Sequence, residues 1–470
     1  MIRPLIGGGS SNCKASEANV GKRRCKHILC QCSSGSMNII QIIQNNGGEA
    51  YLVGGCVRDM VLKEKPHDED ITTSLTPDQV TQLFESQGYK VRPTGLQHGT
   101  VTVIVDGEGY EITTFRKEST YSDNRHPDAV EFSTDVKDDC SRRDFTFNAM
   151  YYDGKQIIDV YGGQKDIDNR VIRTVGNPDE RFQEDSLRMM RAIRFSSKLD
   201  FSIDPEVIKS IKKNKKLIHN VSQERITTEL TKTIQGPNRR YAMRVMQETG
   251  LLKEIMPELD KLKSVKQNNK YHHEDAFEHT LSVMDKCPSD DHQLQYAAMF
   301  HDLGKGNVKQ VDPDGTEHFV GHEQESARLA DDLCKRMKMS TEDRKTIVKL
   351  VRNHESPRTD KRSKVAKFVN DHQNITDEEY EKLQKLWYAD RIVHKIPDTS
   401  KLDGFTNHLN TILKGPHRIN DLSVKGDDLI KLGYKGESIG KAQKYLLKQS
   451  LANNTNDKDQ LIKLLKGFKE

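Results

Sequence analysis

Long apolar runs are missing from this chain of 470 residues. A membrane-spanning helix needs roughly 20 consecutive apolar residues, whereas the longest apolar pieces, such as Val101–Val105, have only the length of a strand. Charged residues make up 31% of the chain. We therefore expect no membrane partner, and a chain of this length is expected to fold into two to four domains.

Cysteines are too few and too scattered for a disulfide framework, with eight in the whole chain. Cys25, Cys30 and Cys32 cluster around His27, but their spacing matches no common zinc-binding pattern. A reducing, cytoplasmic compartment is therefore the expected location.

A strong charge of one sign is also absent. The 74 lysines and arginines nearly balance the 70 aspartates and glutamates, which leaves a formal net charge of +4. This balance does not exclude a nucleic-acid partner, because a basic channel can coexist with acidic catalytic residues and acidic surfaces elsewhere.

The patterning of the chain predicts an α+β fold in five segments. Residues 1–36 combine glycine and serine with basic residues and have no amphipathic period, so we expect a disordered or extraneous extension. Residues 37–175 alternate helix and strand patterns. Long helical periods then predict three helical segments, at residues 176–270, 271–395 and 396–470.

Two glycines and two aspartates form the densest chemical motif. Gly54 and Gly55 follow an apolar strand pattern and precede a helix pattern, so backbone N–H groups can approach a phosphate there. Asp68 and Asp70 lie two residues apart, which in a strand places both on one face. Two carboxylates held that close need a counter-charge, and Mg²⁺ shared with substrate phosphates supplies it. The combination predicts a nucleotidyl-transfer site.

Arg58 and Glu111 complete this predicted site. Arg58 lies one turn into the helix that follows the glycines, where a guanidinium suits a triphosphate. Glu111 lies in a strand pattern beyond a hairpin signal, and it is the candidate third carboxylate of a two-metal arrangement. The alternative for Glu111 is an ordinary surface position, and the alternative for an isolated Asp-x-Asp is a solvated turn.

Four later motifs make the pattern specific. They are Arg142–Met150, Asp159–Ile167, Glu184–Phe195 and Gln223–Leu230. Together with Gly-Gly-x12-Asp-x-Asp they resemble, in the same order, the motifs of class II tRNA nucleotidyltransferases. These are the CCA-adding enzymes, whose close relatives are the bacterial poly(A) polymerases. The resemblance implies a polymerase-β-like nucleotidyltransferase head with a mixed sheet, followed by an all-helical neck, body and HD-type tail.

The resemblance also implies that protein side chains select the base. Asp185 and Arg188 are three residues apart, so on a helix they share one face. Cytosine and adenine both present an amino donor beside a ring-nitrogen acceptor, which a carboxylate and a guanidinium can pair. Arg143, Arg191 and Arg194 would bind nucleotide phosphates. Taken alone, this segment could also be an amphipathic basic helix with internal ion pairs.

Histidines and aspartates in the second half follow the order of an HD-type metal phosphohydrolase: His279, His301, Asp302 and Asp390. This order resembles the HD domain. Imidazoles combined with carboxylates suit a transition metal such as Ni²⁺, Mn²⁺ or Fe²⁺ better than Mg²⁺. His322 and His354 could bind a second metal ion or could be ordinary histidines.

The sequence thus predicts a template-independent enzyme that transfers CMP, CMP and AMP from CTP and ATP to the 3′ end of tRNA. Residues 116–141 are similar to the family's flexible loop, which favours addition of the full CCA. Some CCA-adding enzymes carry an HD region with phosphohydrolase or 2′,3′-cyclic phosphodiesterase activity. The alternatives are a poly(A) polymerase, or an HD phosphohydrolase with an RNA-binding head. No obligatory protein partner is indicated.

Overall fold

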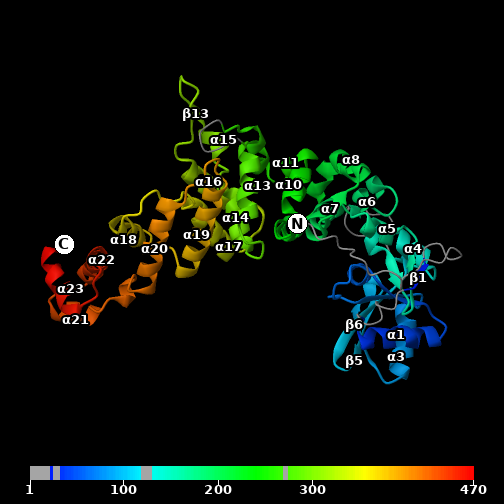
Figure 1. The fold of residues 1–470 in the computed structure, drawn as a ribbon. Coiled ribbons are helices and arrows are strands. Elements are labelled where there is room, and N and C mark those ends of the chain that lie inside the picture. Colours follow the sequence, from blue (N-terminus) through cyan, green and yellow to red (C-terminus); the bar gives the residue numbers. More distant parts are fainter. Residues whose placement is uncertain (1–21, 25–31, 118–129, 268–273, 470) are drawn as a thin grey trace. The chain divides into compact units, whose positions relative to one another are not determined.

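The computed structural model describes residues 22–24, 32–117, 130–267 and 274–469 of the protein (Figure 1). The chain divides into two compact units, Met1–Ile255 and Met256–Glu470. Among the described residues, none of the helices combines the length and the apolar character that crossing a membrane requires.

A mixed sheet forms the first half of the first unit. Within the described residues it has eight strands, in the order β1 (Lys22–Arg24), β10 (Gln156–Asp159), β9 (Met150–Tyr152), β2 (Ala50–Val53), β3 (Asp70–Thr73), β6 (Glu108–Thr114), β5 (Thr100–Val105) and β4 (Lys90–Gly95). Only β3 and β6 run parallel to each other, and the other pairs are antiparallel. Leu52, Ile71 and Ile112 are opposite one another across three strands and are fully buried.

Local sequence explains how the sheet is connected. Asp106 and Gly107 both adopt positive φ, which is the backbone of the tight hairpin turn predicted between β5 and β6. Helix α3 (Pro77–Ser86) begins with a capping box made by Thr76 and Gln79. It packs against β4 and β5, while α1 (Ser34–Asn45) packs against β2 (Figure 1).

The rest of the first unit is mainly helical. Its helices are α2 (Gly55–Val61), α4 (Val136–Ser141), α5 (Gly163–Asp168), α6 (Pro178–Glu184), α7 (Leu187–Leu199), α8 (Pro205–Asn214), α9 (Gln223–Ile234), α10 (Arg239–Glu248) and α11 (Leu251–Ile255). Two short strand pairs, β7 (Arg116–Lys117) with β8 (Glu131–Phe132) and β11 (Val171–Ile172) with β12 (Ser202–Ile203), complete it.

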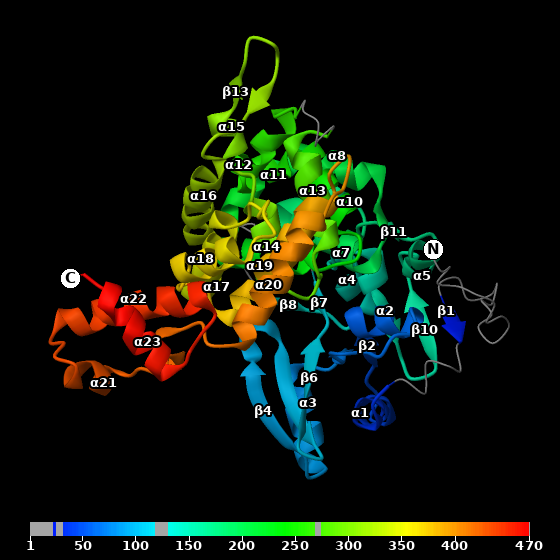
Figure 2. The ribbon, with the colours of Figure 1, turned by 60° about the vertical axis from the view of Figure 1, so that its left-hand side comes forward.

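The second unit consists of helices and one short hairpin. The helices are α12 (Pro257–Asp260), α13 (Ala276–Lys286), α14 (His292–Phe300), α15 (Lys305–Val308), α16 (His322–Arg336), α17 (Thr341–Arg352), α18 (Arg362–Asp371), α19 (Asp377–Ile392), α20 (Ser400–Lys414), α21 (Gly426–Lys431), α22 (Glu437–Asn453) and α23 (Lys458–Leu464). The hairpin of β13 (Gln310–Val311) and β14 (Glu317–His318) projects from the helices of this unit (Figure 2).

The predicted α+β class, with a mixed sheet followed by helices, is confirmed. Two boundaries differ from the prediction. Helix α1 begins at Ser34, inside the expected extension of residues 1–36, and buries Ser36. The two units separate after Ile255, inside the segment 176–270, because α12 and the turn after it pack with the helices of the second unit.

Candidate active site

The glycine turn lies between β2 and α2. Gly54 has φ 81° and ψ −141°, a backbone conformation that residues with a side chain rarely adopt. Gly55 begins α2, and the N–H groups of Val57 and Arg58 both donate to the carbonyl of Gly54. The turn thus lies at the end of β2, beside the start of β3, where the acidic residues are.

Asp70 and Glu111 lie side by side on neighbouring parallel strands. Asp70 is the first residue of β3, and Ile71 is opposite Ile112 in β6, so Asp70 and Glu111 point to the same face of the sheet. Both residues are exposed, although the Asp70 carboxyl itself is partly desolvated. Asp68 lies before β3 begins. Contrary to our expectation, strand alternation therefore does not set the direction of its side chain.

The charges around Asp70 show which groups gather at this site. Burial raises the pKa of the Asp70 carboxyl, Arg143 lowers it, and Glu111 and Asp68 raise it further. The net effect is a raised pKa. Asp70 is therefore close enough to Asp68 and to Glu111 to be repelled by both. Among the described residues, these three carboxylates are not one of the groups whose ligand atoms all lie within 4.8 Å of one another.

Glu69, between the two aspartates, bonds to the beginning of α1. One of its carboxylate oxygens accepts a hydrogen bond from the backbone N–H of Ser33 at 2.8 Å. The other accepts from the hydroxyl groups of Ser33 and Ser36, at 2.5 and 2.6 Å. Ser33 and Ser36 therefore hold Glu69, and with it the segment between Asp68 and Asp70, against the start of α1.

Arg143 is held by a buried carboxylate that the sequence analysis did not single out. Its guanidinium donates to Asp139 at 3.1 Å and to the hydroxyl of Tyr151 at 2.9 Å. Although burial alone would raise the pKa of Asp139, Arg143 and Arg142 lower it well below its usual range. Asp139 is thus a carboxylate in the core of the head.

Arg58 is buried, with an exposed fraction of 5%. It donates to Asp59 at 3.0 Å and to the amide oxygen of Asn148 at 3.0 Å, and its guanidinium lies 5.2 Å from the ring centre of Phe195. These contacts join α2 to the motif Arg142–Met150 and to α7.

Asp185 and Arg188 do not lie on one continuous helix, contrary to the expectation. Asp185 ends α6 with extended backbone, and α7 begins only at Leu187. The carboxylate of Asp185 accepts from the backbone N–H of Leu187, and Arg188 pairs with Glu184 at 2.7 Å. Arg188 also donates to the carbonyl oxygen of Arg142, which connects α7 to the segment that contains Arg143.

Arg191 and Arg194 are paired with carboxylates distant in the sequence. Arg191 donates to Asp144 at 2.6 Å, and Arg194 lies 2.8 Å from Glu229 of α9. Burial raises the pKa of Asp144, but Arg191 and Arg188 outweigh it and lower the pKa to about 2. The arginines on α7 are thus oriented by ion pairs.

The histidines and aspartates of the second unit converge on a second site. One ligand atom each of His279, His301 and Asp390 lies within 4.8 Å of the others. The same holds for Asp302, His322 and His354. The predicted HD residues therefore come together from α13, the end of α14 and α19, and both additional histidines join them.

Asp302 lies between the two groups. Its Oδ2 is 3.5 Å from His279 Nε2 and 3.2 Å from His301 Nε2. Its Oδ1 is 3.5 Å from His322 Nε2 and 3.8 Å from His354 Nε2. A carboxylate in this position can contribute one oxygen to each of two cations.

The donor set fits metal binding. The Nδ1 atoms of His301, His322 and His354 each bond to the carbonyl oxygen three residues earlier, which leaves Nε2 directed into the site. Burial is the main cause that lowers the pKa of His354, to about 3. Among the described residues, neither His301 Nε2 nor Asp302 Oδ2 has a hydrogen bond of good geometry, although both are buried.

The predicted flexible loop, residues 116–141, is only partly described. Residues 118–129 lie outside the described residues. Its first residue, Arg116, is opposite Phe132 in the β7–β8 pair.

The carboxylates that orient the arginines were missed by the sequence analysis. For two of them a local signal exists: Asp139 lies three and four residues before Arg142 and Arg143, and Glu184 lies four residues before Arg188. Asp144 and Glu229 lie far from their partners in the sequence, so local spacing carries no signal.

Family models match three parts of the chain. The family model described as "Poly A polymerase head domain" matches residues 50–173. The model "Probable RNA and SrmB- binding site of polymerase A" matches residues 200–263, and "HD domain" matches residues 269–387.

Relatives and solved structures agree with the family models. A CCA-adding enzyme of Lactobacillus helveticus is 46% identical over 47% of this chain and 54% of its own length. The CCA-adding enzyme of Bacillus subtilis is also 46% identical, over 47% and 55%. The structure of the Bacillus stearothermophilus CCA-adding enzyme in complex with CTP superposes with a TM-score of 0.64 and 25% identity, covering 94% of this chain and 98% of that one.

The chain spans about half the length of the curated relatives it matches. The polymerase-β-like head and the HD domain expected from the motifs are both found, in that order. The chain therefore contains, in this order, a poly(A) polymerase head domain, a polymerase A type RNA-binding segment and an HD domain, and it is similar in sequence and in fold to CCA-adding enzymes.

Proposed function

We propose that this protein is a template-independent CCA-adding enzyme that transfers CMP, CMP and AMP from CTP and ATP to the 3′ end of tRNA. The observation that carries the proposal is the position of Asp70, which lies next to the glycine turn, is opposite Glu111, and is affected by the charges of Asp68, Glu111 and Arg143. The names of the relatives support CCA addition, and one related structure is a Thermotoga maritima CCA-adding enzyme complexed with tRNA.

In this proposal, Asp68 and Asp70 would hold Mg²⁺, which would supply the positive charge that favours attack by the 3′-hydroxyl and departure of pyrophosphate. Their mutually repelling carboxylates fit that cation, and Glu111 adds a third oxygen ligand from the adjacent strand. Gly54 and Gly55 let the backbone approach the triphosphate, because neither has a side chain at the turn.

Basic groups of the head and α7 bind and orient the nucleotide. The charge of Arg143 lowers the pKa of Asp70, and in this proposal it neutralises charge on the phosphates. Arg58, Arg191 and Arg194 are already fixed by carboxylates or amides, so they keep the nucleotide pocket in shape and present positive charge to it.

Base selection belongs to Asp185 and Arg188. A carboxylate accepts from the amino group of cytosine or adenine, and a guanidinium donates to the neighbouring ring nitrogen. In this structure Arg188 is bonded to Glu184 and to the carbonyl of Arg142. An incoming base therefore has to share or replace these bonds, which links base recognition to the segment carrying Arg143.

The HD unit is a second candidate activity, that of a metal-dependent phosphohydrolase. The position of Asp302 between two histidine pairs favours it. A bound pair of transition-metal ions such as Ni²⁺, Mn²⁺ or Fe²⁺ would activate water for attack on a phosphate ester, for example a 2′,3′-cyclic phosphate. His279, His301 and Asp390 would hold one ion, His322 and His354 the other, and Asp302 both.

The first experiment offers Mg²⁺ with each nucleotide, singly and together, to a tRNA transcript that lacks its CCA end. Products are resolved at single-nucleotide length. Two additions with CTP, and a third and final one only when ATP is present, support CCA addition. A long ladder with ATP alone indicates a poly(A) polymerase, and no extension contradicts nucleotidyl transfer.

A double substitution separates the two sites. Asp68→Ala together with Asp70→Ala should abolish addition and leave hydrolysis of a 2′,3′-cyclic nucleotide at the wild-type rate. Loss of both activities in a folded variant would contradict the two-site proposal.

A further inference from the structure

Asp139 is a fully buried carboxylate that accepts hydrogen bonds from four groups. Its Oδ2 accepts from the hydroxyl of Tyr151 at 2.6 Å and from Arg143 at 3.1 Å. Its Oδ1 accepts from Arg142 at 2.9 Å and from the backbone N–H of Arg116 at 3.1 Å. A buried carboxylate is costly unless it is paired and hydrogen-bonded, so this arrangement balances the desolvation of Asp139 with two cations.

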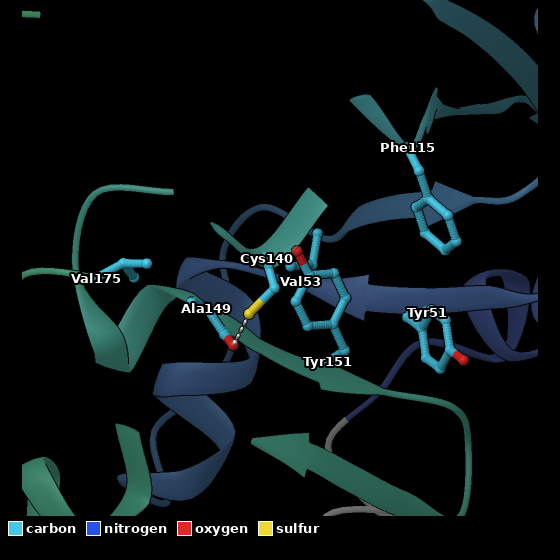
Figure 3. Close-up of a cluster of buried hydrophobic side chains, with 7 residues drawn as sticks. All are labelled: Tyr51, Val53, Phe115, Cys140, Ala149, Tyr151 and Val175. Atoms are coloured by element: carbon cyan, nitrogen blue, oxygen red, sulfur yellow. Dashed lines mark hydrogen bonds between the residues drawn. The ribbon is translucent and has the colours of Figure 1, made fainter. Parts of the chain in front are cut away.

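Tyr151 closes a triangle of hydrogen bonds with Asp139 and Arg143. Its hydroxyl donates to Asp139 and accepts from Arg143 Nε at 2.9 Å. The Tyr151 ring packs in the core cluster with Tyr51 and Cys140, as Figure 3 shows. The ring cannot move without disturbing the core, so the hydroxyl is a fixed point for the guanidinium.

The triangle fixes the guanidinium of Arg143 in orientation as well as in position. Nε bonds to Tyr151 and Nη2 bonds to Asp139, and a planar group held at two atoms has little freedom to rotate. Nη1 donates to none of the described residues.

The sheet places this triangle beside the acidic site. Tyr151 is opposite Val53 in β9 and β2, and Val53 is opposite Asp70 in β2 and β3. Residues opposite each other in a sheet share a face, so Tyr151 and Asp70 project from the same side two strands apart. Arg143 is bonded to Tyr151 of this row, and its charge lowers the pKa of the Asp70 carboxyl.

We propose that Asp139 and Tyr151 are positioning residues that hold Arg143 at the acidic site, where it binds the triphosphate of the incoming nucleotide. The inference rests on the proposed function. Asp139 supplies the negative charge that pairs with the guanidinium of Arg143. Tyr151 supplies the second hydrogen bond, which orients the guanidinium. Neither residue touches the nucleotide.

Tyr151→Phe tests the proposal because it removes one hydroxyl and keeps the ring. Tyr152→Phe is the matched control: Tyr152 is the next residue of the same strand, is equally buried, and donates only to the carbonyl of Gly154 at 2.9 Å. We expect Tyr151→Phe to raise the KM for CTP and ATP about tenfold, the effect of one hydrogen bond to a charged group, with a smaller change in kcat. Tyr152→Phe should leave both constants near wild type.

A double-mutant cycle shows whether Tyr151 acts through Arg143. Arg143→Lys keeps the charge and loses the two-point contact. In that background, we expect Tyr151→Phe to add less than about a twofold further change in KM, because the bond it removes is already gone. Additive effects would overturn the proposal, and so would equal KM values for Tyr151→Phe and Tyr152→Phe.

Asp139→Asn extends the test to the carboxylate. It keeps the shape of the side chain and its acceptor oxygen but leaves two half-buried cations, Arg142 and Arg143, without their counter-charge. We expect a larger rise in KM than Tyr151→Phe produces, measured below the melting temperature of every variant. An unchanged KM in a folded Asp139→Asn protein would overturn the proposal.

The failure of this inference is distinguishable from failure of the proposed function. The assay starts with wild-type protein, CTP and a tRNA transcript lacking its CCA end. Absence of any addition by the wild type contradicts the proposed function and, with it, the role of Arg143. Addition by the wild type with no effect of Tyr151→Phe contradicts the positioning role alone.

Discussion

Glu111 lies beside Asp70 on the neighbouring parallel strand, on the same face of the sheet. Both residues are exposed, and the repulsion between them contributes to the raised pKa of Asp70. Because these like charges repel each other, the folded protein is less stable without a cation at this site than with one.

Asp70→Asn should abolish nucleotide addition and slightly stabilise the metal-free protein at pH 7. The folded-state pKa of Asp70 is raised, so ionising it costs stability as the pH rises above its unfolded value, about 4. The gain, on the order of 0.5 kcal/mol after solvent screening, should vanish near pH 3 and in saturating Mg²⁺. Thermal unfolding measures it.

Glu108→Gln is the control for this change, because it removes one negative charge from the exposed start of the same strand β6. It should leave addition intact. A Tm for Asp70→Asn that is lower than wild type at pH 7 would contradict the repulsion argument.

Glu69→Ala should destabilise the head and slow addition. Its carboxylate accepts three hydrogen bonds from Ser33 and Ser36 at the start of α1, and losing them costs about 1 kcal/mol or more. A chain beginning at Met37 lacks both serines and should show a comparable loss. Urea unfolding and single-turnover addition measure the two effects.

Glu85→Ala, at an exposed position of α3, is the matched control for Glu69→Ala and should change neither quantity. A chain starting at Met37 with wild-type stability would show that the Ser33 and Ser36 contacts contribute nothing.

Asp185→Ala should relax base choice. Without the carboxylate, uracil and guanine no longer place a carbonyl oxygen against a negative charge, so their relative kcat/KM should rise about tenfold or more. Incorporation of UTP and GTP relative to CTP measures this. Glu180→Ala, an exposed acidic position on α6, should keep the wild-type preference; unchanged rejection of UTP and GTP by Asp185→Ala would remove Asp185 from base selection.

Asp302→Asn should weaken transition-metal binding to both histidine groups by about a hundredfold or more, because Asp302 approaches all four imidazoles. Phosphohydrolase activity should disappear while CCA addition continues. Calorimetry with Ni²⁺ or Mn²⁺ measures the binding. Asp332→Asn, on the exposed side of α16, should bind metal like the wild type.

An equal metal affinity in Asp302→Asn and Asp332→Asn would contradict the shared-carboxylate arrangement. Loss of CCA addition in a folded Asp302→Asn protein would contradict the independence of the two sites.

Local pattern predicted the elements of the head well, because short-range rules determine them. The turn at Asp106 and Gly107 needs positive φ at both positions, and the sequence supplies residues that tolerate it. The start of α1 was predicted too late, because what recruits Ser33 to Ser36 is Glu69, more than thirty residues away. The break between Asp185 and Leu187 was also missed, since helical spacing continues across it.

By itself, the sequence determined the order of the motifs, the α+β class and the identity of the acidic, basic and histidine residues that gather at the two sites. Only the tertiary structure decided which carboxylate holds which arginine, as Asp139 holds Arg143 and Asp144 holds Arg191. It also decided that Asp302 lies between two histidine pairs. The reason is physical: burial makes an unpaired charge costly, so each buried group takes its partner from whatever the fold brings within hydrogen-bond distance.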